Sequence, residues 1–136
     1  MENAGLSIVY VSAATHPMSD AELEALLHKA REHNACHGIS GLLLYGDGNF
    51  MQLLEGPPDE VAALYGRIQR DPRHHMVTTV LEEPDLPREF ADWSMAYRRV
   101  DAPTWLRITE LAGVGGPPVQ LSVVKGLLAS FWKSVT

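Results

Sequence analysis

Cysteine is nearly absent from this sequence: the 136 residues include only Cys36, so no disulfide can form within the chain. Basic residues are also scarce, with eleven Lys and Arg against seventeen Asp and Glu, a formal charge of −6. This balance argues against nucleic acid, whose phosphates bind surfaces rich in Lys and Arg. Apolar runs are far shorter than the roughly 20 residues that cross a membrane, and the N-terminal MENAGLSIVY lacks the basic start of a signal peptide. We therefore expect a cytoplasmic domain that binds neither membrane nor nucleic acid.

The rest of the composition is typical of one globular domain. Apolar residues make up 46% of the chain and charged residues 21%, which excludes the disordered, collagen-like and coiled-coil classes. A chain of this length buries roughly two-thirds of its unfolded surface. It can therefore form one compact core but not two.

Apolar periodicity predicts both helices and strands. The first helix follows a capping box at Ser19-Asp20-Ala21-Glu22 and ends near Asn34. The second opens at Gly56-Pro57-Pro58-Asp59, where prolines suit a helix start, and stops at Asp71-Pro72. The predicted strands are Leu6–Ser12, Gly38–Tyr45, Asn49–Glu55, Met76–Leu81 and Trp93–Val100.

The order β-α-β-β-α-β, followed by one more strand, predicts an α+β fold of the ferredoxin-like type with an additional fifth strand. Both helices should then cover one face of the sheet. The other face would be an exposed apolar patch unless something covers it. Two C-terminal helices, Pro103–Leu111 and Leu121–Trp132, are expected to provide that cover.

Sequence motifs of common enzymes and metal sites are missing. The glycine-containing segments lack the lysine and the strand-loop-helix context of a phosphate loop, and no Ser or Cys stands in a nucleophile motif. His33 and His37 have the i, i+4 spacing seen in zinc sites, with Cys36 between them. Because the chain offers no further ligands at suitable spacing, we expect no metal.

Three polar residues stand in or beside apolar segments: Tyr10 in the first strand, Gln52 in the third, and Asn34 at the end of the first helix. A buried phenol or amide must find hydrogen-bond partners or it costs free energy. Two interpretations follow. Tyr10 and Gln52 could satisfy each other, or all three groups could converge on a polar ligand held in the core.

These residues belong to an ordered set that resembles the BLUF family, the sensors of blue light using FAD. The resemblance extends over about residues 6 to 97, in family order and at family spacing. One departure is Ser40, where the family usually has Thr, and both residues carry a hydroxyl. The matching segments are Tyr10-Val11-Ser12, Asn34, Gly38-Ile39-Ser40-Gly41-Leu42-Leu43, Phe50-Met51-Gln52-Leu53-Leu54-Glu55-Gly56, Arg67-Ile68, Asp71-Pro72-Arg73-His74 and Arg88-Glu89-Phe90-Ala91-Asp92-Trp93-Ser94-Met95.

The resemblance implies that a flavin lies between the two helices on one sheet face. FAD is the expected form, and the sequence does not distinguish it from FMN or riboflavin. Trp93 and Met95 are the pair linked to signal output in the family. The resemblance also implies polar contacts: Asn34 at flavin N3 and O4, Gln52 between Tyr10 and flavin N5/O4, and Arg73, with Asp71 nearby, at the pyrimidine edge or ribityl chain. It implies that His33 lies beside the ring and that Ile8 and Ile39 pack on it. Ser12 and His74 complete the implied site.

The implied chemistry suits these residue types. A phenol is a good one-electron donor whose proton becomes acidic on oxidation, and an amide carries both a donor and an acceptor. By resemblance, an electron and a proton pass from Tyr10 through Gln52 to the excited flavin and rapidly return. Gln52 then donates a new hydrogen bond to flavin O4, by rotation or by tautomerisation, and shifts the absorption to the red. The change would bias the fifth strand and the C-terminal helices.

We expect residues 1–100 to form the sensor and residues 101–136 a helical output segment. No catalytic activity is expected from the chain itself, so output would pass through a downstream protein or through a homo-oligomer. One alternative is a light-independent adaptor of the same fold. Another is a small enzyme of the acylphosphatase type, but residues 13–18 offer no arginine or glycine-rich loop for an anion.

Overall fold

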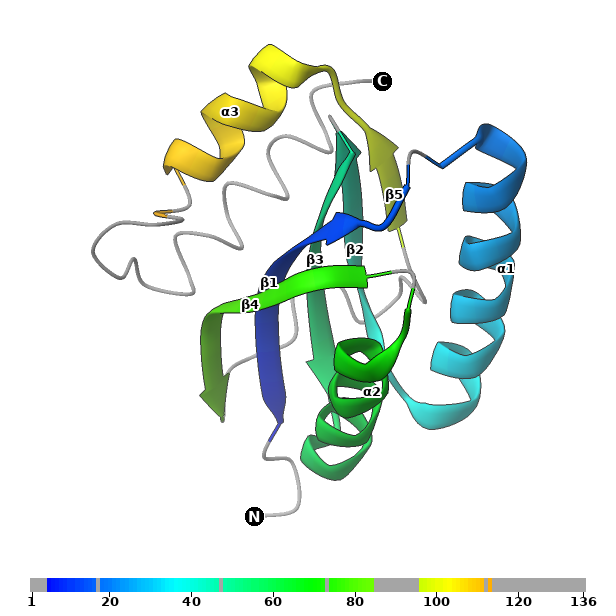
Figure 1. Ribbon diagram of the computed structural model, residues 1–136. Helices are drawn as coiled ribbons and strands as arrows, with labels where there is room; N and C mark the ends of the chain where they lie inside the picture. The colour runs from blue at the N-terminus through cyan, green and yellow to red at the C-terminus, as the bar shows by residue number, and fades with distance from the viewer. Residues whose placement is uncertain are drawn as a thin grey trace.

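The computed structural model describes residues 5–16, 18–46, 48–72, 74–84, 96–111 and 113. Strands and helices follow one another along the chain in the predicted order (Figure 1). They are β1 (Leu6–Ala14), α1 (Asp20–His37), β2 (Ser40–Gly46), β3 (Asn49–Gly56), α2 (Pro58–Arg70), β4 (His74–Pro84), β5 (Ala96–Arg99) and α3 (Ala102–Leu111). No helix in the described part of the chain is long and apolar enough to cross a membrane.

The strands form one sheet in the order β4-β1-β3-β2-β5. β1 pairs antiparallel with both β3 and β4, and β2 pairs antiparallel with β3. β5 adds to the edge of the sheet, parallel to β2. The predicted ferredoxin-like fold with a fifth strand is therefore confirmed.

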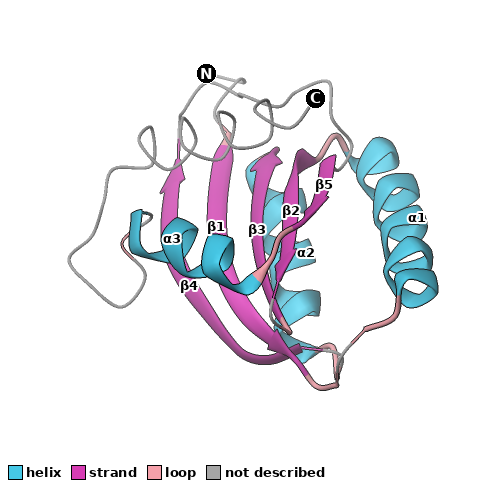
Figure 2. Cartoon of the chain, turned by 90° about the horizontal axis from the view of Figure 1, so that it is seen from above, coloured by secondary structure: helices cyan, strands magenta, loops and turns pink. Residues whose placement is uncertain are grey.

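The helices lie on both faces of the sheet (Figure 2). α1 and α2 cover one face, as predicted, and α3 lies across the other. Because side chains alternate between the two faces of a strand, Ile8 and Tyr10 join the core beneath α1 and α2, while Val9 points to the opposite face. Trp105 and Ile108 are the buried residues of α3. The first predicted C-terminal helix is confirmed, and Leu121–Trp132 lies outside the described residues.

The ends of α1 show how local sequence sets the helix length. The predicted capping box is present: the Ser19 side chain accepts from the Glu22 backbone, and the Glu22 side chain accepts from the Ser19 backbone. The predicted end near Asn34 is too early, because the first residue to adopt the left-handed conformation is Gly38. Gly38 and Ile39 still donate backbone hydrogen bonds to the Asn34 carbonyl. β2 therefore starts at Ser40 and not at Gly38.

β4 is longer than predicted because it follows β1 along most of its length. Two irregularities interrupt this pairing, one between Val9 and Tyr10 and one between Val11 and Ala13. Met76, which has a φ of 53°, lies in the segment of β4 at the second irregularity. Such bulges add a residue to one strand and redirect its side chains, so apolar alternation alone could not define this strand.

Two glycines give opposite expectations for the same substitution. A Cβ at Gly41 would overlap the backbone carbonyl oxygen of Leu53 on β3, whereas a Cβ at Gly66 in α2 would lie 3.5 Å from the nearest atom, Arg70 Nη1. Gly41→Ala should lower the free energy of unfolding by about 3 kcal/mol or more, as overpacking against backbone does. Gly66→Ala should raise it by about 0.5–1 kcal/mol, because alanine favours helix. Urea unfolding midpoints test both, and a tolerated Gly41→Ala would contradict the close pairing of β2 and β3.

Candidate functional site

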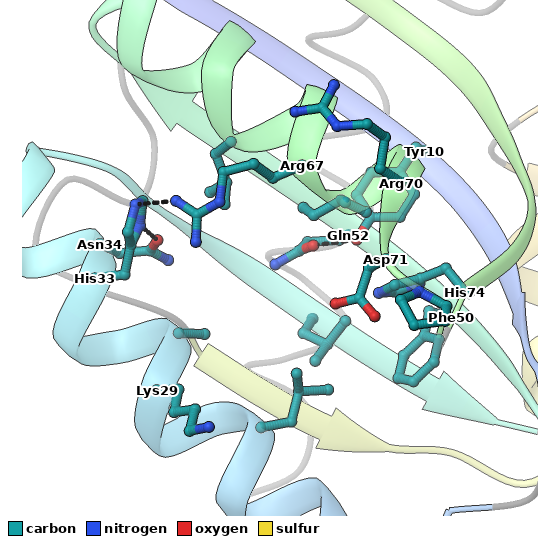
Figure 3. Close-up of a pocket in the computed structure, with 16 residues that line it drawn as sticks. Tyr10, Lys29, His33, Asn34, Phe50, Gln52, Arg67, Arg70, Asp71 and His74 are labelled. Carbon is teal, nitrogen blue, oxygen red and sulfur yellow. Dashed lines mark hydrogen bonds between the residues drawn. The ribbon is translucent and has the colours of Figure 1, made fainter.

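A cavity of about 500 Å³ lies between α1 and α2, with the sheet as its floor (Figure 3). Apolar side chains from both helices and from β2 form part of its wall, and polar and charged groups form the rest. The lining residues are Tyr10, Leu43, Phe50, Gln52 and His74 from the strands, Leu26, Lys29, Ala30, His33 and Asn34 from α1, and Leu64, Arg67, Ile68, Arg70, Asp71 and Pro72 from α2 and the segment after it.

Tyr10 and Gln52 form a hydrogen-bonded pair on the floor of this cavity. They are directly opposite each other in the register of β1 and β3, so both side chains point to the face that α1 and α2 cover. The Tyr10 hydroxyl donates to Gln52 Oε1. Tyr10 is 1% exposed and Gln52 7%. Figure 3 shows the Gln52 amide nitrogen on the side away from Tyr10, toward α1.

The environment of Tyr10 keeps its phenol protonated. Burial raises the pKa of Tyr10 well above the ordinary value of 10.0, and the neighbouring Tyr65 and Asp71 raise this pKa further. Because desolvation disfavours the phenolate, the Tyr10 hydroxyl retains the proton that it shares with Gln52. The Tyr10 hydroxyl therefore stays protonated at neutral pH.

His33 and Arg67 bridge the two helices at the cavity. Arg67 Nη1 lies 3.0 Å from His33 Nε2, and His33 Nδ1 lies 3.3 Å from Asn34 Oδ1 (Figure 3). A guanidinium can only donate, so His33 Nε2 must accept and the ring proton must be on Nδ1. That proton is then donated to Asn34 Oδ1, which orients the carboxamide. Asn34 itself is buried at 1% exposure.

His74 and Phe50 close the end of the cavity next to Tyr10. His74 Nδ1 lies 2.8 Å from Ser12 Oγ, and the His74 ring contacts both Phe50 and Tyr10, with centroids 5.0 Å and 6.2 Å apart. The predicted residue Ser12 therefore contributes by holding His74, and is not itself among the lining residues. His74 is fixed against β1 in this way.

Three cations at the cavity were missed by the sequence analysis: Lys29 on α1 and Arg67 and Arg70 on α2. Lys29 is exposed and also lines the cavity. Lys29 could have been predicted at the site from its spacing of four residues from His33, because residues four apart share a helix face. Arg67 and Arg70 could not be predicted in this way, because no local sequence pattern indicates that α1 and α2 face each other across the cavity.

The structure brings together six of the predicted site residues around one cavity: Tyr10, His33, Asn34, Gln52, Asp71 and His74. Ile8 and Ile39 are not among its lining residues and lie in the buried core beneath α1 and α2. Their contact with a ligand stays a prediction. Arg73, Trp93 and Met95 lie outside the described residues.

Comparisons with known proteins agree with this arrangement. The model of the BLUF family, described as sensors of blue-light using FAD, matches residues 6–96. The chain is 44% identical over 90 residues to the photoactivated adenylate cyclase subunit beta of Euglena gracilis, which aligns 65% of this chain with 10% of that protein. The chain thus spans about a tenth of the length of this relative.

Solved structures show the same fold. BlrB, a BLUF protein in its dark state, superposes with a TM-score of 0.76 and 28% identity, covering 99% of this chain and 100% of BlrB. BlrP1 of Klebsiella pneumoniae, solved with FMN and cyclic diGMP, gives a TM-score of 0.64 and 32% identity over 70% of this chain and 26% of BlrP1.

The raised pKa of Tyr10 predicts a pH dependence of stability. A group whose pKa is higher in the folded state stabilises the fold fully below its unfolded pKa, and this contribution is lost as the pH rises through the folded value. The difference in unfolding free energy between wild type and Tyr10→Phe should therefore decrease as the pH rises above 10.0, the ordinary value for tyrosine. Urea unfolding of both proteins on either side of that pH measures the difference. Parallel pH profiles would contradict the burial of a protonated phenol.

Proposed function

The chain belongs to the BLUF family, the blue-light sensors that use FAD, and on that premise we propose that its signal starts at the Tyr10–Gln52 pair on the cavity floor. The single observation that carries the proposal is the hydrogen bond from the Tyr10 hydroxyl to Gln52 Oε1 inside a cavity of ligand size. An acylphosphatase-type enzyme or a light-independent adaptor would leave this buried pair beside the cavity without a role.

The cavity suits an isoalloxazine ring. Its volume of about 500 Å³ lies within the range of small-molecule sites, which are mostly apolar with a few placed polar groups. Leu26, Ile68 and Leu43 supply apolar wall from α1, α2 and β2. Asn34 and Gln52 supply amides that can both donate and accept, as the polar edge of the ring requires.

Each residue then has a defined part. Bound flavin supplies the absorption of blue light and, when excited, a strong one-electron oxidant. Tyr10 is the phenol placed to give one electron to this oxidant, while its proton would pass along the existing hydrogen bond to Gln52 Oε1. When the electron and the proton return to Tyr10, Gln52 is left rotated or tautomerised. Asn34, held by His33 and through it by Arg67, keeps the ligand in place while Gln52 changes.

The cations of the cavity support a phosphorylated flavin, FAD or FMN, over riboflavin. Lys29, Arg67 and Arg70 line the space between α1 and α2 in a chain whose net charge is −6. Arginine and lysine form charge-assisted hydrogen bonds with phosphate. The structural relative BlrP1 was solved with FMN. Arg73, Ile8, Ile39, Ser12, Asp71 and His74 complete the proposed flavin site.

The proposed output runs through β5 into α3. β5 pairs with β2 beside the cavity residue Leu43, which is the register partner of Tyr97. Only Val100 and Asp101 separate β5 from α3, and Asp101 Oδ1 caps that helix by accepting from the Thr104 backbone, 2.9 Å away. Hydrogen bonds with the side chain of Thr104 and with its backbone lower the pKa of Asp101. A shift of β5 would therefore carry α3 with it.

We place the sensor in residues 1–100 and the output segment in residues 101–136, with Trp93 and Met95 linking the two. The relatives named above include a cyclase subunit of which this chain covers only a tenth. The chain itself would act as a sensor without catalytic activity. We propose that it acts in the cytoplasm on a downstream protein, either directly or through a change in homo-oligomer state.

Absorption spectroscopy tests the proposed transfer of a proton and an electron from Tyr10 by way of Gln52, which we call the relay. The purified protein should be yellow and should show a reversible red shift after blue light. Tyr10→Phe and Gln52→Ala should retain flavin but lose the shift, because each removes one end of the hydrogen bond that carries the proton.

Tyr45→Phe is the matched control for the relay. Tyr45 is another buried tyrosine on the same sheet face, and its hydroxyl accepts from the Met18 backbone, outside the cavity lining. This variant should keep the full shift. A normal shift in Tyr10→Phe, or a colourless protein that cannot be reconstituted with FAD or FMN, would contradict the proposal.

Flavin titrations test the role of the cations. Lys29→Gln and Arg70→Gln should each weaken FMN binding by about tenfold, the value of one hydrogen bond to a charged group, and leave riboflavin binding unchanged. Arg107→Gln removes an exposed arginine on α3, across the sheet from the cavity, and should change neither affinity. Equal losses for FMN and riboflavin would show that these cations do not bind the phosphate.

A further inference from the structure

A second buried phenol stands directly against Tyr10. Tyr65 of α2 is 7% exposed, and its ring centroid lies 5.3 Å from that of Tyr10 at an interplanar angle of 39°. This is the distance range in which aromatic pairs attract each other. Tyr65 is not among the residues that line the cavity. It therefore touches the relay from outside the ligand site.

A hydrogen bond to β4 holds Tyr65 in this position. The Tyr65 hydroxyl lies 2.5 Å from Thr79 Oγ1. Burial raises the pKa of Tyr65, and the hydrogen bond from Thr79 opposes that rise. The ring of Tyr65 is thus fixed at both ends, by its backbone in α2 and by its hydroxyl on β4.

An irregularity in the sheet places Thr79 where it can make this bond. Val9 pairs with Leu81, so uninterrupted pairing would put Val80 opposite Tyr10. The register shift puts Thr79 there instead. Directly opposite residues share a sheet face, so the bulge brings a hydroxyl to the side that α2 covers. Valine at that point could not bind the phenol of Tyr65.

We propose that Tyr65, anchored by Thr79, is a positioning residue that holds the ring of Tyr10 in the orientation from which its hydroxyl reaches Gln52. Thr79 of β4, Tyr65 of α2 and Tyr10 of β1 together form what we call the clamp. Without the anchor, the Tyr65 ring can turn about its side-chain bonds, and the face of Tyr10 that it contacts is no longer fixed. The Tyr10–Gln52 hydrogen bond is then formed for a smaller fraction of the time. This inference rests on the proposed function, because the relay is what the clamp serves.

The test compares Tyr65→Phe, Thr79→Val and the double variant with wild type, all loaded with FAD. The readouts are the quantum yield of the red shift and the fluorescence lifetime of the bound flavin, which shortens when Tyr10 is oxidised. Each single variant should lower the yield by about fivefold, the value of one net hydrogen bond, and lengthen the lifetime. The double variant should be no worse than either single variant, because both remove the same bond.

Two further variants separate positioning from general stability. Thr79→Ser keeps the hydroxyl and should restore the wild-type yield. Thr78→Val is the matched control on the same strand: its hydroxyl donates to the Met76 carbonyl, 3.2 Å away, and it should have no effect on yield or lifetime. Variants that bind flavin with the wild-type dark spectrum are folded around the ligand, and the yields are compared among those.

The outcomes distinguish the two proposals. If wild type shows no red shift, the proposed function fails. If wild type shifts and both Tyr65→Phe and Thr79→Val keep its yield and lifetime, the clamp is contradicted while the relay stands. Loss of yield in Thr79→Ser equal to that in Thr79→Val would also overturn the clamp, because the hydroxyl would then be irrelevant.

Discussion

The fold is organised around one polar pair, Tyr10 and Gln52, whose hydrogen-bonding groups are buried in an apolar core and need partners there. Tyr10 and Gln52 lie in the middle of the sheet, and each would cost free energy if buried alone. The antiparallel register of β1 and β3 sets them opposite each other, so the phenol donates to the amide. Since side chains alternate along a strand, a slip of one residue in either strand would separate the pair across the sheet. The register that buries the apolar face therefore also builds the relay.

The helices above this pair determine which ligand can bind beside it. α1 and α2 leave a cavity between them, while the bridge from Arg67 to His33 and on to Asn34 ties the two helices together across it. The charged groups of the cavity come from the helices and the segment that follows α2, and the floor is neutral. A ligand with an apolar ring system, a polar edge and an anionic tail matches this distribution. These features suit the flavin site that we propose.

Element order and the central residues could be predicted from sequence because they depend on local patterns. Short apolar runs, the capping box and the helix-breaking prolines define the strands and helices, and polar residues in apolar segments marked Tyr10, Asn34 and Gln52. The two interpretations of that trio turn out to be compatible, since Tyr10 and Gln52 bind each other and also line the cavity. The cations and the Tyr65–Thr79 bond were not predictable in this way. They depend on the packing of α2 and on a bulge that shifts β4 by one residue, and neither leaves a periodic signal.

In the mechanism that we propose, light changes the hydrogen bonding of Gln52 through Tyr10. The most direct measurement is a light-minus-dark infrared difference spectrum of the flavin-loaded protein with isotopically labelled glutamine side chains. We expect a difference band that shifts with the label, together with a lowered flavin C4=O stretch, and we expect both to be missing in Tyr10→Phe. A light-induced red shift without any label-sensitive band would contradict this mechanism, because Gln52 would then have the same hydrogen bonds in both states.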